Sequence, residues 1–163
     1  MPEEKLVETH VENLAGNSAP IAATETISVV IPLYNERDSL EQLFTELNNT
    51  LRMIGRPYEI IFVNDGSTDG SIEVLHKLCE RSPLVKIIDF RRNFGKAAAL
   101  AEGFKEAKGD IIFTLDADLQ DDPREIPNFL RKLSEGYDLV SGWKYHRHDP
   151  ISKTLPSKLF NKV

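Results

Sequence analysis

An acidic segment, DADLQDDP at Asp116–Pro123, is the part of the sequence best suited to chemistry. Asp116 and Asp118 follow an apolar run and lie two residues apart, so both carboxylates project to the same side where a strand ends. Two such charges repel one another unless a cation lies between them. Carboxylate oxygens suit Mg²⁺ or Mn²⁺, and the amide oxygen of Gln120 can add a further ligand. The segment therefore predicts a metal site formed by Asp116, Asp118 and Gln120.

An ordinary acidic turn is the alternative interpretation of this segment. Pro123 suits the first turn of a helix, and Asp121 and Asp122 would then lie at the helix N-terminus, where acidic side chains interact favourably with the helix dipole. This alternative stays open for Asp121 and Asp122. It fits Asp116 less well, because that residue directly follows the apolar run 111–115.

Three other polar segments also follow apolar runs of strand length: PLYNE at 32–36, NDGSTD at 64–69 and RRNFGK at 91–96. The carboxylate of Asp65 can accept hydrogen bonds from ribose hydroxyls or a base N–H. Asp69 and Ser67 can instead cap the helix that follows. In the third segment, Asn93 and the basic side chains can hold a diphosphate at a helix start, or form a solvated charged turn.

The elements that carry these segments alternate between strands and helices. Strands are predicted at 27–34, 58–64, 84–90, 110–116 and 138–143, and helices at 40–54, 72–79, 97–107 and 123–136. In the third helix the apolar repeat runs through Ala97, Leu100, Ala101, Phe104 and Ala107. Unbroken apolar strands separated by helices predict an α/β fold with a doubly wound, mostly parallel sheet. All four polar segments would then meet at the carboxyl edge of that sheet, where such sheets bind ligands.

Composition narrows the class of protein. The 163 residues are 40% hydrophobic and 28% charged, as expected of one globular domain. A net charge of −6 disfavours a general nucleic-acid binder, and the single cysteine excludes an internal disulfide framework. The sequence has no apolar stretch long enough to span a membrane and no secretory signal at its start, so we expect a cytoplasmic protein. The oligomeric state stays open.

The two ends differ in charge from the centre. We interpret residues 1–26 as a polar, flexible N-terminal arm, with the domain running from residue 27 to residue 163. The C-terminal end is basic and partly apolar, and it can lie along the anionic surface of a membrane, at its cytoplasmic face, or begin a further helix. Its basic residues are Lys144, Arg147, Lys153, Lys158 and Lys162.

Taken in order, PLYNE, VNDGSTD, RRNFGK and DADLQDDP resemble the motifs of the family 2 glycosyltransferases, which have a GT-A, Rossmann-like nucleotide-sugar-binding domain. The similarity covers residues 27–163. It is greatest to the polyprenyl-phosphate sugar transferases, namely the dolichyl-phosphate mannose synthases and the bactoprenol glucosyltransferases. The resemblance implies a chain that lacks the acceptor segment on the C-terminal side of the family's catalytic domain.

The resemblance also implies roles for individual residues. Asp116, Asp118 and Gln120 would be the catalytic, metal-binding group under the diphosphate of a UDP- or GDP-sugar. Lys144 falls where the family usually has an arginine that meets the acceptor phosphate. The remaining residues expected to bind substrate are Pro32, Tyr34, Asn35, Glu36, Asp65, Ser67, Asp69, Asn93 and Lys96.

The implied activity is metal-dependent, inverting transfer of a sugar to a polyprenyl phosphate, either dolichyl or undecaprenyl phosphate. A phosphate acceptor is already ionised near pH 7 and needs no general base, whereas a sugar hydroxyl would need one. Two alternatives stay open: a nucleotide-binding or interaction module without turnover, and a transferase that acts on a saccharide hydroxyl.

Overall fold

The computed structural model describes residues 9–12 and 24–142 of the chain. Within these ranges the parallel strands are β2 (Ile27–Leu33), β3 (Tyr58–Asn64), β4 (Val85–Asp89) and β5 (Ile111–Thr114). They form one sheet in the order β4-β3-β2-β5, and every neighbouring pair is parallel. The predicted α/β fold with a parallel sheet is confirmed.

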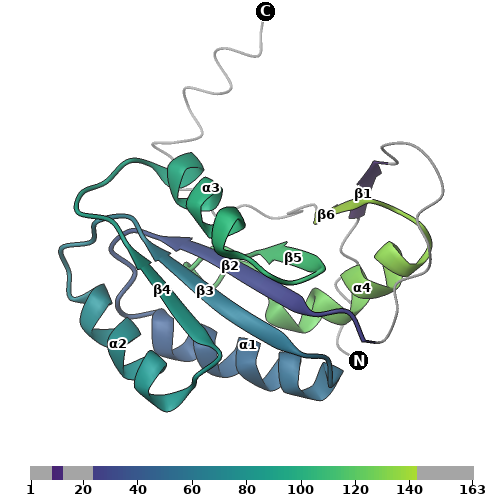
Figure 1. Cartoon of the computed structure of the whole chain (residues 1–163), viewed down its shortest axis with the longest axis horizontal. Helices are drawn as coiled ribbons and strands as arrows, with labels where there is room; N and C mark the ends of the chain where they lie inside the picture. Colours follow the sequence, from purple (N-terminus) through teal and green to yellow (C-terminus); the bar gives the residue numbers. More distant parts are fainter. Residues whose placement is uncertain (1–8, 13–23, 143–163) are drawn as a thin grey trace, which may run out of the picture.

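Helices cover both faces of this sheet (Figure 1). On one face lie α1 (Leu40–Ile54) and α2 (Ser71–Arg81). The short 3-10 helix η1 (Pro123–Glu125) and α4 (Ile126–Ser134) lie on the same face. The other face is covered by α3 (Lys96–Glu106). The larger core lies between the sheet and α1, and its fully buried side chains include Phe62, Leu43 and Leu47. The double winding follows from strands that are apolar on both faces.

Two short strands form a separate antiparallel sheet. The predicted strand at 138–143 is present as β6 (Leu139–Gly142), but it pairs with β1 (Thr9–Glu12) and not with the parallel sheet. Strand β1, which lies within the N-terminal arm, was not predicted from the sequence. Its four residues lack the apolar run of the other strands, and its partner is distant in sequence. The domain boundary at residue 27 stays a prediction.

The face that helix α3 turns to the sheet agrees only in part with the one that its apolar repeat predicted. Ala97, Ala101 and Phe104 are exposed, with Phe104 at 46%. The residues buried against the sheet are Ala99 and Gly103. A Cβ on Gly103 would lie 2.3 Å from Cγ1 of Val30, so the helix approaches the sheet at its smallest side chains. Leu100 and Ala107 of the apolar repeat are partly buried and pack against the smaller core, so the predicted face is correct for these two residues and wrong for the three exposed ones.

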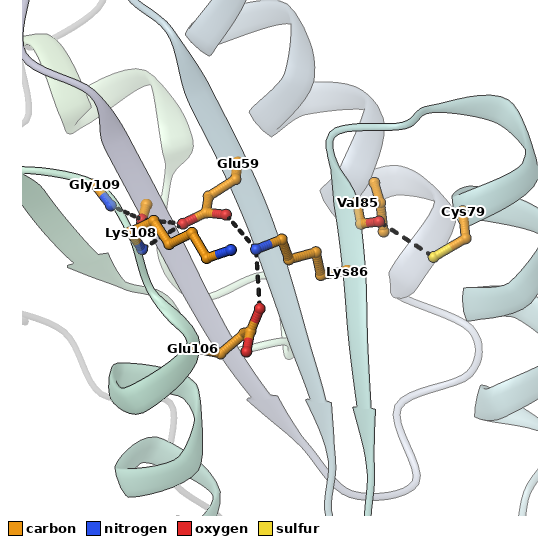
Figure 2. Close-up of polar contacts among 8 residues, drawn as sticks. Glu59, Cys79, Val85, Lys86, Glu106, Lys108 and Gly109 are labelled. Atoms are coloured by element: carbon orange, nitrogen blue, oxygen red, sulfur yellow. Dashed lines mark hydrogen bonds and ion pairs between the residues drawn. The ribbon is translucent and has the colours of Figure 1, made fainter.

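The partly buried carboxylate of Glu59 fixes the amino-terminal end of the sheet (Figure 2). Oε1 of Glu59 accepts hydrogen bonds from the Ser28 hydroxyl at 2.6 Å and from the Lys108 backbone N–H at 2.7 Å. Its Oε2 lies 2.9 Å from Nζ of Lys86, which also pairs with Glu106 at 3.0 Å. These contacts hold the turn between α3 and β5 against β2 and β3. They thereby help to set the position of β5, which leads into the acidic segment.

Acid should weaken this network. Burial favours a higher pKa for Glu59, but the hydrogen bonds from Ser28, Lys108 and Lys86 outweigh it and lower the pKa below 4.5. A lowered folded-state pKa adds stability that is present above pH 4.5 and is lost as the pH falls through the folded value. We expect Glu59→Gln to cost about 2 kcal/mol at pH 7.

Denaturant unfolding of both proteins between pH 7 and pH 3 measures this contribution. The difference in unfolding free energy between wild type and Glu59→Gln should shrink as the pH falls below 4.5. A difference that stays constant across this range would contradict the assigned role of the Glu59 carboxylate.

Within residues 9–12 and 24–142, no helix combines the length and the apolar character needed to cross a bilayer.

Candidate nucleotide and metal site

A pocket of about 270 Å³ opens at the carboxyl ends of β2, β3 and β5. The chain passes from β2 outward to β3 and β4, and then returns to place β5 on the other side of β2. Ligands of doubly wound sheets bind where the strand order reverses in this way. The pocket is lined by Pro32, Leu33, Tyr34, Glu36, Asp65, Asn93, Gly95, Lys96, Ala99, Asp116, Ala117 and Asp118.

Most of the residues proposed from the sequence meet in this pocket. They arrive from four segments that are far apart in the chain, and the eight that line it are Pro32, Tyr34, Glu36, Asp65, Asn93, Lys96, Asp116 and Asp118. Four others, Asn35, Ser67, Asp69 and Gln120, do not line it. Lys144 lies outside the described residues.

Three of the residues outside the pocket join the loops after β2 and β3. The Asn35 N–H donates to Oγ of Ser67 at 2.9 Å, and the side-chain oxygen of Asn35 accepts from the Thr68 N–H at 2.8 Å. Asn35 adopts a left-handed backbone with φ of 56°, which asparagine tolerates better than most residues. Oδ2 of Asp69 accepts from the Arg37 N–H at 3.0 Å. These hydrogen bonds tie the loop after β2 to the loop after β3.

Asp69 also serves the start of α2. Its Oδ1 accepts hydrogen bonds from the backbone N–H and the hydroxyl of Ser71, at 3.0 and 2.6 Å. Burial works to raise the pKa of Asp69, but the hydrogen bonds from Ser71 and Arg37 outweigh it and lower the pKa. The N-cap of α2 is Gly70 and has no side-chain cap hydrogen bond, so the prediction that Asp69 or Ser67 caps this helix is wrong. Asp69 instead binds Ser71, the first residue of the helix, and a contact between Asp69 and substrate stays a prediction.

The acidic segment turns back on itself at the mouth of the pocket. Lys96 Nζ lies 2.5 Å from Oδ1 of Asp116, and the Asp116 N–H donates to Oδ2 of Asp121 at 2.9 Å. Asp118 is exposed, and its Oδ1 accepts the Gln120 N–H at 3.0 Å across Leu119, whose φ is 62°. Asp116 and Asp118 therefore face one pocket, while Gln120 contributes its backbone to the turn.

Asp122 behaves as an ordinary helix cap. Its Oδ1 accepts the Arg124 N–H at 2.9 Å at the start of η1, and its carboxylate also pairs with the Arg124 guanidinium. The helix-capping interpretation is confirmed for this residue.

The electrostatics of the pocket favour a cation. The pKa of Glu36 is raised, first by partial burial and then by the neighbouring charges of Asp118, Asp69 and Asp116, against a hydrogen bond with Ser39 that lowers it. A carboxylate whose pKa is raised by several acids lies in a negative potential. A positive ion at this position would relieve that repulsion.

The donor set fits a cation that binds together with a phosphate ligand. Within residues 9–12 and 24–142, the structure contains no group of three His, Cys, Asp or Glu side chains that could hold a metal ion. Mg²⁺ and Mn²⁺ commonly use one or two protein carboxylates and complete their coordination with water and substrate phosphates. Asp116 and Asp118 can supply those two carboxylates.

Four residues that line the pocket were not among those proposed from the sequence. Gly95 and Ala99 lie at the start of α3, Ala117 lies between the two aspartates, and Leu33 ends β2. Their signal was weak, since glycine, alanine and leucine carry no polar side chain. Their position beside the polar segments was the available indication.

The model of the family described as "Glycosyl transferase family 2" matches residues 28–161. An undecaprenyl-phosphate 4-deoxy-4-formamido-L-arabinose transferase of Pseudomonas savastanoi pv. phaseolicola is 42% identical over 137 residues, covering 83% of this chain and 40% of the relative. The protein of the same name from Klebsiella pneumoniae (strain 342) is 42% identical over 139 residues, which are 84% of this chain and 42% of the relative. The chain thus spans about two fifths of the length of these relatives.

Solved structures support the same fold. The mannosyltransferase PcManGT from Pyrobaculum calidifontis, in complex with GDP-Man and Mn²⁺, has a TM-score of 0.54 and 25% identity, over 68% of this chain and 32% of that one. The glucosyl-3-phosphoglycerate synthase from Mycobacterium tuberculosis, in complex with UDP, has a TM-score of 0.53 and 24% identity, over 69% of this chain and 41% of that one. Together with the match to the family model, the ordered motifs at one sheet edge identify this chain as a member of glycosyl transferase family 2.

Proposed function

We propose that this domain binds a UDP- or GDP-sugar together with Mg²⁺ or Mn²⁺ and transfers the sugar, with inversion, to a polyprenyl phosphate. The observation that carries the proposal is the pocket at the strand-order reversal, where residues from four distant segments meet. The names of the relatives support a polyprenyl phosphate acceptor, and the mannosyltransferase complex supports a nucleotide-sugar donor with a divalent ion.

The donor would lie along the pocket from β3 to β5. Tyr34 is about half exposed at the rim and offers a flat face to a nucleobase. Asn93, Gly95 and Lys96 stand at the N-terminus of α3, where the helix dipole favours an anion. We assign the diphosphate to this end of the pocket.

Asp116 and Asp118 would hold the cation beside the diphosphate, and Gln120 is retained as a further proposed ligand. When bound, the ion neutralises the charge that develops on the leaving diphosphate as the glycosidic bond breaks. Lys96 places a second positive charge within reach of the same oxygens, because its ammonium group already lies against Asp116. In this arrangement the side chains of the chain orient the donor and stabilise the leaving group.

The acceptor would approach the anomeric carbon from the side opposite the diphosphate, and direct displacement there inverts the configuration. A phosphate oxygen needs no deprotonation near pH 7, so the pocket does not have to supply a base. Lys144 and the basic C-terminal end, which can contact a membrane surface, remain proposed partners of the acceptor phosphate.

Incubation with UDP- and GDP-sugars, Mn²⁺ and a short prenyl phosphate tests the proposal. We expect a prenyl-phosphate sugar of inverted configuration, and none with the matched prenyl alcohol, which has no ionised oxygen. Metal-dependent nucleotide binding without any product would favour a module without turnover. Product formed only with saccharides would favour a hydroxyl acceptor.

A further inference from the structure

We propose that Asp65 is a positioning residue that fixes the loop Arg91–Gly95 and the start of α3, so that Asn93 and Lys96 face the diphosphate. The proposal rests on the proposed function for the identity of the ligand. It differs from the expectation drawn from the sequence, in which the Asp65 carboxylate holds the nucleoside directly.

Both oxygens of the Asp65 carboxylate are engaged by the loop. Oδ1 accepts the Phe94 N–H at 2.7 Å, and Oδ2 accepts the Gly95 N–H at 2.8 Å. Asp65 is only 3% exposed, although it contributes to the lining of the pocket. Charge-assisted hydrogen bonds to two successive N–H groups fix both the position and the orientation of this peptide segment. The carboxylate therefore acts as a two-point anchor for the loop.

The backbone after Asp65 also packs directly against this loop. A Cβ on Gly66 would lie 2.4 Å from the carbonyl carbon of Arg92 and 2.7 Å from the nitrogen of Asn93. Gly66 has a φ of 69°, which further favours glycine at this position. On the other side of Asp65, the Asn64 carbonyl accepts the Phe90 N–H at 2.9 Å. The end of β3 therefore holds the loop at both ends and along its middle.

The anchored loop leads directly into α3. Gly95 has a φ of 93° and precedes Lys96, the first residue of the helix, while its carbonyl accepts the N–H groups of Ala98 and Ala99. Any shift of Gly95 would therefore displace the first turn of α3. Lys96 would move with it, and its ammonium group would leave Asp116, which lies 2.5 Å away. Asp65 thus acts on the diphosphate end of the pocket through the backbone.

A double-mutant cycle separates this role from direct contact with the nucleoside. Asp65→Asn keeps one acceptor oxygen but turns an amide group toward an N–H donor, and Lys96→Gln removes the ammonium group. Binding of UDP and of GDP with Mn²⁺ would be measured by calorimetry for wild type, both single variants and the double variant. Each single variant should weaken binding about tenfold.

If Asp65 acts through Lys96 and its loop, the two effects overlap, and the double variant should bind within about twofold of the weaker single variant. If Asp65 contacts the nucleoside independently, the effects multiply to about a hundredfold. A multiplied effect would overturn the proposal.

Hydrogen exchange tests the anchor without any nucleotide. In Asp65→Asn, the backbone amides of residues 90–96 should exchange at least about tenfold faster than in wild type. The reason is that the substitution alters the two carboxylate oxygens that accept the Phe94 and Gly95 N–H groups. Asp110→Asn is the matched control, since Oδ2 of Asp110 also accepts a backbone N–H, that of Thr26 at 2.8 Å, at the opposite end of the sheet. Unchanged exchange at 90–96 in Asp65→Asn would overturn the proposal even if wild type bound no nucleotide.

Gly66→Ala provides a second variant that leaves the Asp65 carboxylate in place. Its new methyl group would push on the backbone of Arg92 and Asn93. The positioning role predicts that this variant also weakens nucleotide binding about tenfold. The role would be contradicted if the loop amides of Gly66→Ala were displaced and this variant nevertheless bound the nucleotide with wild-type affinity.

Discussion

Replacing Asp118 with asparagine is expected to weaken Mn²⁺-dependent binding of UDP or GDP about a hundredfold. The reason is the small number of protein ligands available to the ion. Asp116 and Asp118 are the two acidic side chains of the DADLQDDP segment that line the pocket, and Asp116 already pairs with Lys96. Loss of the Asp118 charge leaves the cation one carboxylate that is shared with an ammonium group.

Titration of the nucleotide with and without Mn²⁺ measures this effect. The matched control is Asp122→Asn, in the same segment, because Asp122 caps η1 and does not line the pocket. The control should bind like wild type. Wild-type binding that does not depend on the metal, or an Asp118→Asn variant with wild-type affinity, would exclude the proposed role of Asp118.

Replacing Phe62 with alanine is expected to destabilise the fold by about 3–5 kcal/mol. Phe62 lies in β3, is 0% exposed and packs in the larger core between the sheet and α1. Removal of the ring abolishes its packing contacts without replacing them, and it leaves a cavity in a close-packed interior. The expected loss is a large part of the total stability of about 5–15 kcal/mol typical of such domains.

Phe104→Ala is the matched control for this substitution. Phe104 is 46% exposed on the outer face of α3, so its truncation should cost less than about 1 kcal/mol. Urea unfolding of both variants tests the assignment. Equal destabilisation by the two substitutions would mean that the face of α3 turned toward the sheet is assigned incorrectly.

The sequence predicted the parallel sheet well because each strand is apolar on both faces. Strands of this kind require helices on both sides, and their alternation with helical periods leaves few other topologies. The same reasoning brought Glu36, Asp65 and Asp116 to one edge, since the carboxyl ends of parallel strands share that edge. These predictions depended on local patterns that tertiary contacts reinforce.

The features missed depended on contacts between distant segments. Strand β1 is stabilised by pairing with β6, and nothing in its four residues indicates that partner. The face of α3 was predicted correctly for Leu100 and Ala107 but not for Phe104, because close approach at Gly103 outweighs the size of that ring. The use of both Asp65 oxygens by Phe94 and Gly95 could not be predicted, since loop geometry decides which donors reach a carboxylate.

The distinction between scaffold and ligand-binding side chains was also beyond the sequence. Asn35, Ser67 and Asp69 are polar residues in the predicted loops, yet their side chains accept hydrogen bonds from backbone N–H groups of the same two loops, those of Thr68, Asn35 and Arg37 respectively. Asp and Asn favour turns and cap positions for the same chemical reason that they bind ligands. Only the positions of the backbone donors separate the two uses.

The proposed site is tested most directly by a crystal structure of this chain with a nucleoside diphosphate and Mn²⁺, using anomalous scattering to locate the metal. We expect an anomalous peak within coordination distance of Asp118 and the diphosphate, with the diphosphate beside Lys96 at the start of α3. A nucleotide bound away from the β2–β5 reversal, or an ion that touches neither Asp116 nor Asp118, would contradict the proposed site.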